Sequence, residues 1–141
     1  MEDCIFCGIA SGGIPSKKVY EDNDFLAFLD IAPIIKGHTL VIPKKHSKNL
    51  LETDQETEDK LFHVVNKVAR AVITATSADG VNITTNVGKA AGQAVFHTHI
   101  HIIPRFENDS LVSWPGTKYD NDEEQDKYAG RIMGVLAHRN S

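Results

Sequence analysis

His97-Thr98-His99-Ile100-His101-Ile102-Ile103 decides how this chain folds, because it places three of the seven histidines at alternate positions in an apolar, β-branched run. Alternate side chains of a strand share one face, whereas on a helix His99 would point about 160° away from the other two histidines. The spacing therefore makes a single site only on a strand. We predict a strand from Ala94 to Ile103, ending at Pro104, with all three imidazoles on one face.

The sequence around this strand predicts further strands and two helices. Thr53-Asp54-Gln55-Glu56 is a capping-box pattern, and apolar residues recur after it at helical spacing until Gly80. A C-terminal helix is predicted from Asn121 onward. The other predicted strands cover 18–21, 24–29, 38–42 and 81–85. This order of elements favours an antiparallel α+β fold with one long helix and a C-terminal helix.

Composition restricts the classes of function. The 141 residues carry 15 Lys+Arg against 19 Asp+Glu, a net charge of −4, so we expect one domain over residues 1–141 and no duplex nucleic acid as partner. No apolar run approaches the roughly 18 residues that a membrane span needs, and the N-terminus is acidic. We therefore expect a cytoplasmic protein with no membrane partner.

The triad itself leaves two kinds of chemistry open. The outer histidines of a straight strand would lie about 13 Å apart, too far to share one metal ion, although an alternate pair could do so with further ligands. A mononuclear metallohydrolase is therefore one alternative. Without a metal, a row of imidazoles offers a nucleophile and cationic donors suited to attack on phosphorus. The small-residue loop 86–93 could add backbone N–H groups that hold an anion.

Several blocks of the chain resemble the histidine-triad family of nucleotide-binding proteins, whose signature is His-φ-His-φ-His-φ-φ with φ hydrophobic. The resemblance implies a homodimer whose antiparallel sheets join, one mononucleotide per subunit, and a nucleotidyl hydrolase or transferase activity. The similar blocks are 4–7, 20–22, 26–31, 36–44, 91–93 and 97–104.

The same resemblance assigns roles to individual residues. His99 would be the nucleophile on the α-phosphorus, His101 would hold a phosphate oxygen, and His38 matches a fourth active-site histidine. Two positions depart from the pattern: Thr98 occupies a φ position, and Ala94 stands where many members have a serine. The nucleotide-binding positions that the resemblance implies are Phe6, Phe28, Asp30 and Ile31 for the nucleoside, and Asn86, Gly92, Gln93 and Ala94 for the phosphate.

A structural zinc ion is the predicted cofactor. Cys4 and Cys7 supply half of a tetrahedral site, and we choose His46 and His97 as the other two ligands, which leaves His99 and His101 free for phosphate. A Cys-x-x-Cys pair with two such histidines also resembles the zinc site of the galactose-1-phosphate uridylyltransferases. With four protein ligands the ion would tie the N-terminus to the triad without activating water.

Two further hypotheses follow from these residues. The leading one is a homodimeric hydrolase that cleaves purine nucleoside phosphoramidates or related nucleotidyl conjugates through a nucleotidyl-histidine intermediate. The alternative is a nucleotide-binding module for signalling or scaffolding with weak or no catalysis, which the missing hydroxyl at Ala94 would permit. In both, the partner is a purine nucleoside monophosphate or its conjugate.

Overall fold

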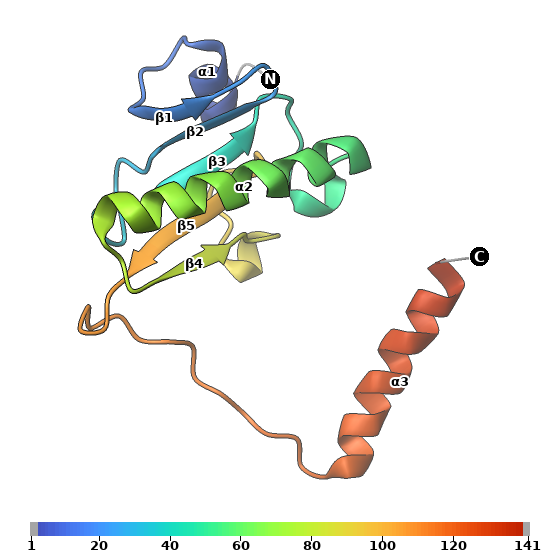
Figure 1. Cartoon of the computed structure of the whole chain (residues 1–141). Coiled ribbons are helices and arrows are strands. Elements are labelled where there is room, and N and C mark those ends of the chain that lie inside the picture. The colour runs from blue at the N-terminus through green and yellow to red at the C-terminus, as the bar shows by residue number, and fades with distance from the viewer. Residues whose placement is uncertain (1–2, 140–141) are drawn as a thin grey trace. The chain divides into compact units, whose positions relative to one another are not determined.

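A computed structural model describes residues 3–139, which form two compact units. The first unit ends at Asp109 and contains the sheet, and the second begins at Ser110 and contains the C-terminal helix (Figure 1). The expectation of a single domain over residues 1–141 stays a prediction. None of the helices within residues 3–139 is long and apolar enough to cross a membrane.

The first unit is built on a five-stranded antiparallel sheet in the order β1-β2-β3-β5-β4. The predicted fold class is thereby confirmed, and the strand predicted over 38–42 lies at the centre of the sheet. The strands predicted over 18–21 and 24–29 are present and pair as an antiparallel hairpin. The strands are β1 (Lys18–Glu21), β2 (Phe25–Leu29), β3 (Thr39–Pro43), β4 (Gly80–Thr84) and β5 (Ile100–Arg105).

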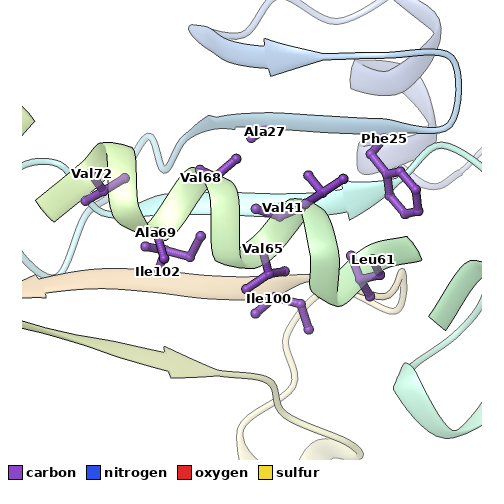
Figure 2. Close-up of a cluster of buried hydrophobic side chains, with 11 residues drawn as sticks. Phe25, Ala27, Val41, Leu61, Val65, Val68, Ala69, Val72, Ile100 and Ile102 are labelled. Atoms are coloured by element: carbon purple, nitrogen blue, oxygen red, sulfur yellow. The ribbon is translucent and has the colours of Figure 1, made fainter. Parts of the chain in front are cut away.

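The long helix α2 (Gln55–Thr76) packs across one face of this sheet (Figure 2). Its apolar side chains recur every three or four residues and meet alternate side chains of the central strands, as the periods of a helix and a strand require. The buried cluster contains Leu61, Val64, Val65, Val68, Ala69 and Val72 of α2 against Phe25, Ala27, Val41, Ile100 and Ile102 of the sheet.

A short helix that the sequence analysis did not predict, α1 (Ile5–Ser11), covers the opposite face. Phe6 and Ile9 of α1 are buried against the alternate positions Leu26 and Phe28 of β2 and Leu40 and Ile42 of β3. With seven residues, α1 is too short for a clear amphipathic period. Its N-cap is Cys4, whose Sγ accepts a hydrogen bond from the Cys7 amide.

Three predicted boundaries were wrong, namely both ends of the triad strand and the N-cap of α2. The triad strand starts at Ile100 rather than Ala94, because the Thr98 amide donates to the Ser47 carbonyl and so leaves the ladder that joins β5 to β3. The strand also runs through Pro104, because β3 pairs with β5 only over 100–102 and the proline has a neighbour on the β4 side alone. The N-cap of α2 is Asp54, one residue after the expected Thr53.

The second unit contains the predicted C-terminal helix, α3 (Asp122–Arg139). Asn121 Oδ1 accepts a hydrogen bond from the Glu124 amide, and Glu124 Oε1 accepts one from the Asp120 amide. These contacts satisfy donors at the N-terminus of the helix, as the Asn-x-x-Glu pattern indicated. The two connecting 3-10 turns of the first unit are η1 (Leu50–Glu52) and η2 (Lys89–Ala91).

Candidate active site and metal site

Three histidines meet on the α1 side of the sheet. His38 immediately precedes β3, His101 lies in β5 one strand away, and His99 immediately precedes β5. The rings of His38 and His101 have their centroids 5.1 Å apart, and those of His99 and His101 are 5.0 Å apart. His97 also faces the α1 side, with its ring centroid 6.0 Å from that of Phe6. Of the three triad histidines only His101 lies within β5, so the expectation that one strand carries all three was wrong.

Hydrogen bonds define the tautomers of His38 and His101. The Ile34 amide donates to His38 Nδ1 at 3.1 Å, so the neutral ring carries its proton on Nε2. His38 Nε2 then donates to His101 Nδ1, which lies 2.9 Å away. The remaining proton of a neutral His101 is consequently on Nε2, where it can be donated to an anion.

The neutral ring of His99 carries its proton on Nδ1, whereas those of His38 and His101 carry it on Nε2. Its Nδ1 lies 2.7 Å from the carbonyl oxygen of His97, and because a carbonyl only accepts, Nδ1 must carry the proton. Nε2 of a neutral His99 therefore bears a free lone pair. The Phe6 ring packs edge-on against this imidazole with centroids 5.1 Å apart, and His99 is only 6% exposed.

Burial keeps all three imidazoles neutral. Burial is the main cause that lowers the pKa of His99, with the His97 carbonyl and Asp30 acting in the opposite direction. Burial, followed by the charges of His99 and His38, lowers the pKa of His101 to about 4. Burial also lowers the pKa of His38, against the effect of Asp30. The site therefore offers a basic nitrogen and a neutral donor, in place of the cationic donors that the sequence analysis expected.

Asp30 lies at the edge of this group. Its Oδ2 is 3.7 Å from His38 Nε2, and its Oδ1 accepts a hydrogen bond from the Ala32 amide. Asp30, His38 and His101 are close enough for their ligand atoms to surround a cation. His38 does not suit this role, because its Nδ1 already accepts the Ile34 amide and a metal at Nε2 would require both ring nitrogens to act as acceptors.

The loop 86–93 is held by its own hydrogen bonds. The amides of Ala91, Gly92 and Gln93 donate to carbonyls within the loop, so these N–H groups do not form the anion-binding nest that the sequence suggested. Gly92 has φ of 96°, and a Cβ there would lie 3.5 Å from Asn86 Nδ2. The positive φ explains the glycine at this turn, because a side chain would fit in the available space but would strain the backbone.

Gln93 is buried and its side-chain amide is fully engaged. Its Oε1 accepts from the Gly88 amide at 2.9 Å, while Nε2 donates to the carbonyls of Lys48 at 2.7 Å and Val95 at 3.1 Å. The side chain thus connects the loop to the segment after β3. Its contacts describe a residue that shapes the loop, rather than one that offers a free donor to phosphate.

The remaining predicted nucleotide-binding residues differ in exposure. Phe6 and Phe28 are buried and pack edge to face with centroids 5.6 Å apart, whereas Ile31 is fully exposed in the loop after β2. Ala94 is exposed in the segment that leads to the triad. Asn86 lies beside Gly92 at the other end of the loop.

Cys4, Cys7, His46 and His97 converge in a second cluster, and their ligand atoms all lie within 4.8 Å of one another. Cys4 and Cys7 come from the start of α1, His46 from the loop after β3, and His97 from the segment before β5. His97 Nε2 donates to the Pro43 carbonyl at 2.7 Å, which leaves Nδ1 unprotonated and facing the cluster. The structure therefore brings together the four residues that the sequence analysis chose.

The separations within this cluster fit a tetrahedral metal site. Zinc–nitrogen bonds of about 2.0–2.1 Å and zinc–sulfur bonds of about 2.3 Å place two nitrogens about 3.3 Å apart and a sulfur and a nitrogen about 3.6 Å apart. His46 Nδ1 is 3.2 Å from His97 Nδ1, and Cys7 Sγ lies 3.3 Å and 3.5 Å from these nitrogens. Cys4 Sγ is 3.3 Å from His97 Nδ1. The donor set and its dimensions suit Zn²⁺.

The sequence analysis missed the residues that orient these histidines. They act through main-chain groups, namely the Ile34 amide and the Pro43 carbonyl, or through the small hydroxyls of Ser47, Thr53 and Thr85. No spacing pattern distinguishes such groups from ordinary loop residues. Thr98 alone carried a signal, because a hydroxyl stood where the surrounding pattern has apolar residues.

Comparisons with known proteins show which family this chain resembles in sequence and in fold. The family model "HIT domain" matches residues 11–108. A crystal structure of a member of the HIT family from Bacillus subtilis is 45% identical, with 94% of this chain and 96% of that chain covered and a TM-score of 0.86. A zinc-bound histidine triad family protein from Mycobacterium smegmatis is 40% identical, with 98% of each chain covered and a TM-score of 0.74. Adenylylsulfatase HINT3 of Arabidopsis thaliana is 46% identical over 109 residues, which are 77% of this chain and 55% of that protein.

Proposed function

This chain belongs to the HIT domain family, and from that premise we propose that it is a nucleotide-binding hydrolase that cleaves nucleoside phosphoramidates or related nucleotidyl conjugates. The observation that carries the proposal is the His99 ring, whose Nδ1 proton is donated to the His97 carbonyl. This bond leaves a neutral, buried Nε2 as the nucleophile.

In the first step His99 Nε2 attacks the α-phosphorus, and the bond from phosphorus to the leaving group breaks. The leaving group departs with the bonding electron pair and takes up a proton from solvent water, so that a phosphoramidate releases an amine, and the nucleotide is carried on Nε2. His101 Nε2–H donates to a phosphate oxygen as charge develops there, and His38 holds His101 in the tautomer that can donate. In the second step water attacks the phosphorus, the P–Nε2 bond breaks, and the nucleoside monophosphate is released.

The nucleoside would bind beside the same histidines. Phe6 and Phe28 provide the apolar wall, the exposed Ile31 covers the base, and Asp30 accepts a ribose hydroxyl. In this proposal Asn86, Gly92 and Ala94 contact the phosphate of the nucleotide. Gln93 holds the loop in shape through its hydrogen bonds to Gly88 and Lys48. A purine fits the family resemblance, and the name of the Arabidopsis relative makes adenylyl sulfate a second substrate to test.

A zinc ion held by Cys4, Cys7, His46 and His97 is part of the proposal. With all four positions taken by protein, the ion would join α1 to the triad segment and supply no activated water. Zinc-bound cysteines must stay reduced, which agrees with the expected cytoplasmic location. We also propose a homodimer, because β4 lies at the edge of the sheet and exposes unpaired backbone groups to a second copy.

Turnover and binding together test the function. The wild type should hydrolyse adenosine 5′-phosphoramidate and bind AMP, whereas His99→Ala should keep AMP binding and lose hydrolysis. Denatured wild type, trapped after rapid mixing, should carry an adenylyl group on His99 by mass spectrometry. Equal rates for the two proteins would remove the hydrolase proposal. AMP binding without turnover by the wild type would support the nucleotide-binding module, which the lack of a hydroxyl at Ala94 favours.

A further inference from the structure

One peptide group links the nucleophile to a neighbouring loop. Its carbonyl, from His97, accepts the Nδ1 proton of His99 at 2.7 Å, and its N–H, from Thr98, donates to the Ser47 carbonyl at 2.8 Å. A peptide group is planar and trans, so the direction of the N–H determines that of the carbonyl. The position of Ser47 therefore determines where the carbonyl that orients His99 points.

The sheet does not hold this peptide group. The ladder between β3 and β5 begins with the pair Val41 and Ile100, so residues 97–99 lie outside it. The Pro43 carbonyl accepts a hydrogen bond from the His97 ring and so anchors His97. Thr85 Oγ1 donates to the His99 carbonyl and so anchors His99. Between these two anchors, the orientation of the segment depends on Thr98 and its contacts with Ser47.

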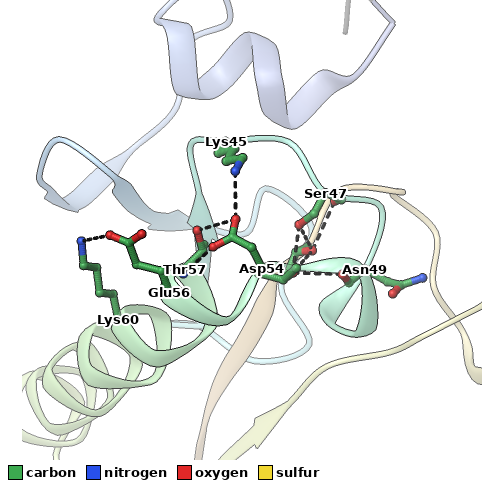
Figure 3. A network of polar contacts seen from close by, with 9 residues as sticks. Lys45, Ser47, Asn49, Asp54, Glu56, Thr57 and Lys60 are labelled. Atoms are coloured by element: carbon green, nitrogen blue, oxygen red, sulfur yellow. Dashed lines mark hydrogen bonds and ion pairs between the residues drawn. The ribbon is translucent and has the colours of Figure 1, made fainter. Parts of the chain in front are cut away.

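The Thr98 hydroxyl lies in a cluster of three hydroxyl groups and also contacts the Ser47 carbonyl oxygen at 3.2 Å. Thr98 Oγ1 lies 2.6 Å from Ser47 Oγ and 3.1 Å from Thr53 Oγ1, and Ser47 Oγ lies 2.9 Å from Thr53 Oγ1. Figure 3 shows the Ser47 side chain within this network. Thr53 Oγ1 also donates to the Asn49 carbonyl at 3.0 Å, which fixes its proton and leaves its lone pairs for the other two hydroxyls. Thr98 is 1% exposed, so water cannot replace a partner that is lost.

We propose that Thr98 is a positioning residue for the nucleophile, whose hydroxyl locks the Ser47 loop to the triad segment and so keeps the His97 carbonyl aimed at His99 Nδ1. This role rests on the proposed function of His99. Thr98 points away from the reacting atoms and contacts no substrate; it acts through the tautomer and the direction of the His99 ring. Loss of the hydroxyl frees the peptide group to rotate, and a His99 ring without its carbonyl partner can place its proton on Nε2, where it blocks attack.

Two substitutions separate the hydroxyl from the shape of the side chain. Thr98→Val keeps the volume and the β-branch, whereas Thr98→Ser keeps the hydroxyl. Thr76→Val is the matched control, because it removes a threonine hydroxyl that donates only to the Val72 carbonyl within α2. Ser47→Ala removes the 2.6 Å contact from its other side and serves if Thr98→Val does not fold.

We expect Thr98→Val to lower kcat on adenosine 5′-phosphoramidate by about 10-fold to 100-fold while KM changes by less than about 3-fold, since a small misplacement of a reacting group costs this much. Thr98→Ser should have a kcat within about 3-fold of the wild-type value, and Thr76→Val should have the wild-type kcat. In spectra of histidine-labelled protein, the Nδ1 proton of His99 should be present and protected from exchange in the wild type and in Thr98→Ser. The same signal should be lost or exposed in Thr98→Val.

The spectroscopic readout needs no turnover, so it separates this inference from the proposed function. A wild type that does not hydrolyse the substrate but shows a Thr98-dependent His99 tautomer would reject the hydrolase and keep the positioning role. A folded Thr98→Val or Ser47→Ala protein with the wild-type His99 signal would overturn the inference. So would a loss of kcat no larger than that of Thr76→Val.

Discussion

His38 Nε2 lies 2.9 Å from His101 Nδ1, and this contact between neighbouring strands determines which nitrogen of His101 can donate a proton. The Ile34 amide donates to the other nitrogen of His38 and so determines the direction of both hydrogen bonds. A main-chain group in the loop before β3 thus sets the tautomer of a residue in β5. The relay gives His38 one donor and one acceptor and gives His101 one donor, while burial lowers the pKa of both rings.

Removing His38 should therefore impair chemistry more than binding. In His38→Phe, His101 Nδ1 loses its donor, and the neutral ring can carry its proton on either nitrogen. We expect kcat on adenosine 5′-phosphoramidate to fall by about 10-fold or more, with KM changed less, because the lost interaction serves mainly the transition state. His63→Phe, on the exposed side of α2, is the control and should retain wild-type values. A His38→Phe protein whose KM rises while kcat stays unchanged would contradict this role.

The lowered pKa of His101 predicts destabilisation by acid. The unfolded chain binds a proton near the ordinary pKa of histidine, about 6.5, while folded His101 does so only near about 4. Between these values the unfolded state binds more protons, so stability falls as pH falls from about 6.5 to about 4. After allowance for solvent screening, the loss by pH 5 is about 1–2 kcal/mol. In urea unfolding, His101→Gln should lose correspondingly less stability than the wild type between pH 7 and pH 5.

The zinc proposal predicts a metal-dependent stability. Protein purified without a histidine tag should contain about one zinc per chain, and Cys4→Ser should lose the metal and melt at a lower temperature. Ser11→Ala, at the other end of α1, controls for changes in the helix and should keep the zinc, because Ser11 Oγ donates only to the Gly8 carbonyl. Fully folded, active wild type without zinc would refute the proposal. Loss of zinc in His99→Ala would favour the metallohydrolase instead.

The sequence predicted most of the sheet and both longer helices, because each has a clear period of two or of about 3.6 residues. It failed where a tertiary contact overrides the period. The strand propensity of residues 94–99 is high, but the Thr98 amide pairs with Ser47 and Gln93 binds three partners in loops. Helix α1 has too few residues to show a period, and its packing on Leu26 and Leu40 is a long-range effect.

The residues of the candidate site and their separation into two groups were predictable from the sequence. The sequence analysis chose His97 as a partner of Cys4 and Cys7 and left His99 and His101 for phosphate, and the structure groups them in this way. The hydrogen bonds that orient the rings were not predictable. The tautomers depend on the Ile34 amide and on the carbonyls of Pro43 and His97. These are main-chain groups, so the residue types in a sequence do not reveal their role. Hydrogen-bond direction can be assigned only once these groups are placed.

The N-cap of α2 offers a test that does not involve the site. Asp54 Oδ1 accepts from the Thr57 amide at 2.8 Å, and Oδ2 contacts Lys45 at 2.9 Å (Figure 3). Asp54→Ala should lower the free energy of unfolding by about 1 kcal/mol, while Asp54→Asn should keep most of it because the cap survives without the charge. Equal losses in Asp54→Ala and Asp54→Asn would assign the effect to the Lys45 ion pair.

Gln93 provides the sharpest distinction between a loop-shaping residue and a phosphate ligand. Its Nε2 donates to the carbonyls of Lys48 and Val95, so Gln93→Glu would place a carboxylate oxygen against two acceptors in a buried position. We expect Gln93→Glu to lower the free energy of unfolding in urea at pH 7 by about 1–3 kcal/mol, because a buried hydrogen bond becomes a repulsive contact. Part of the loss relative to the wild type should disappear near pH 5, where a protonated glutamic acid can donate to one carbonyl. A residue that only contacted phosphate would give a stable Gln93→Glu protein with weakened AMP binding, and that result would return Gln93 to the phosphate-binding role.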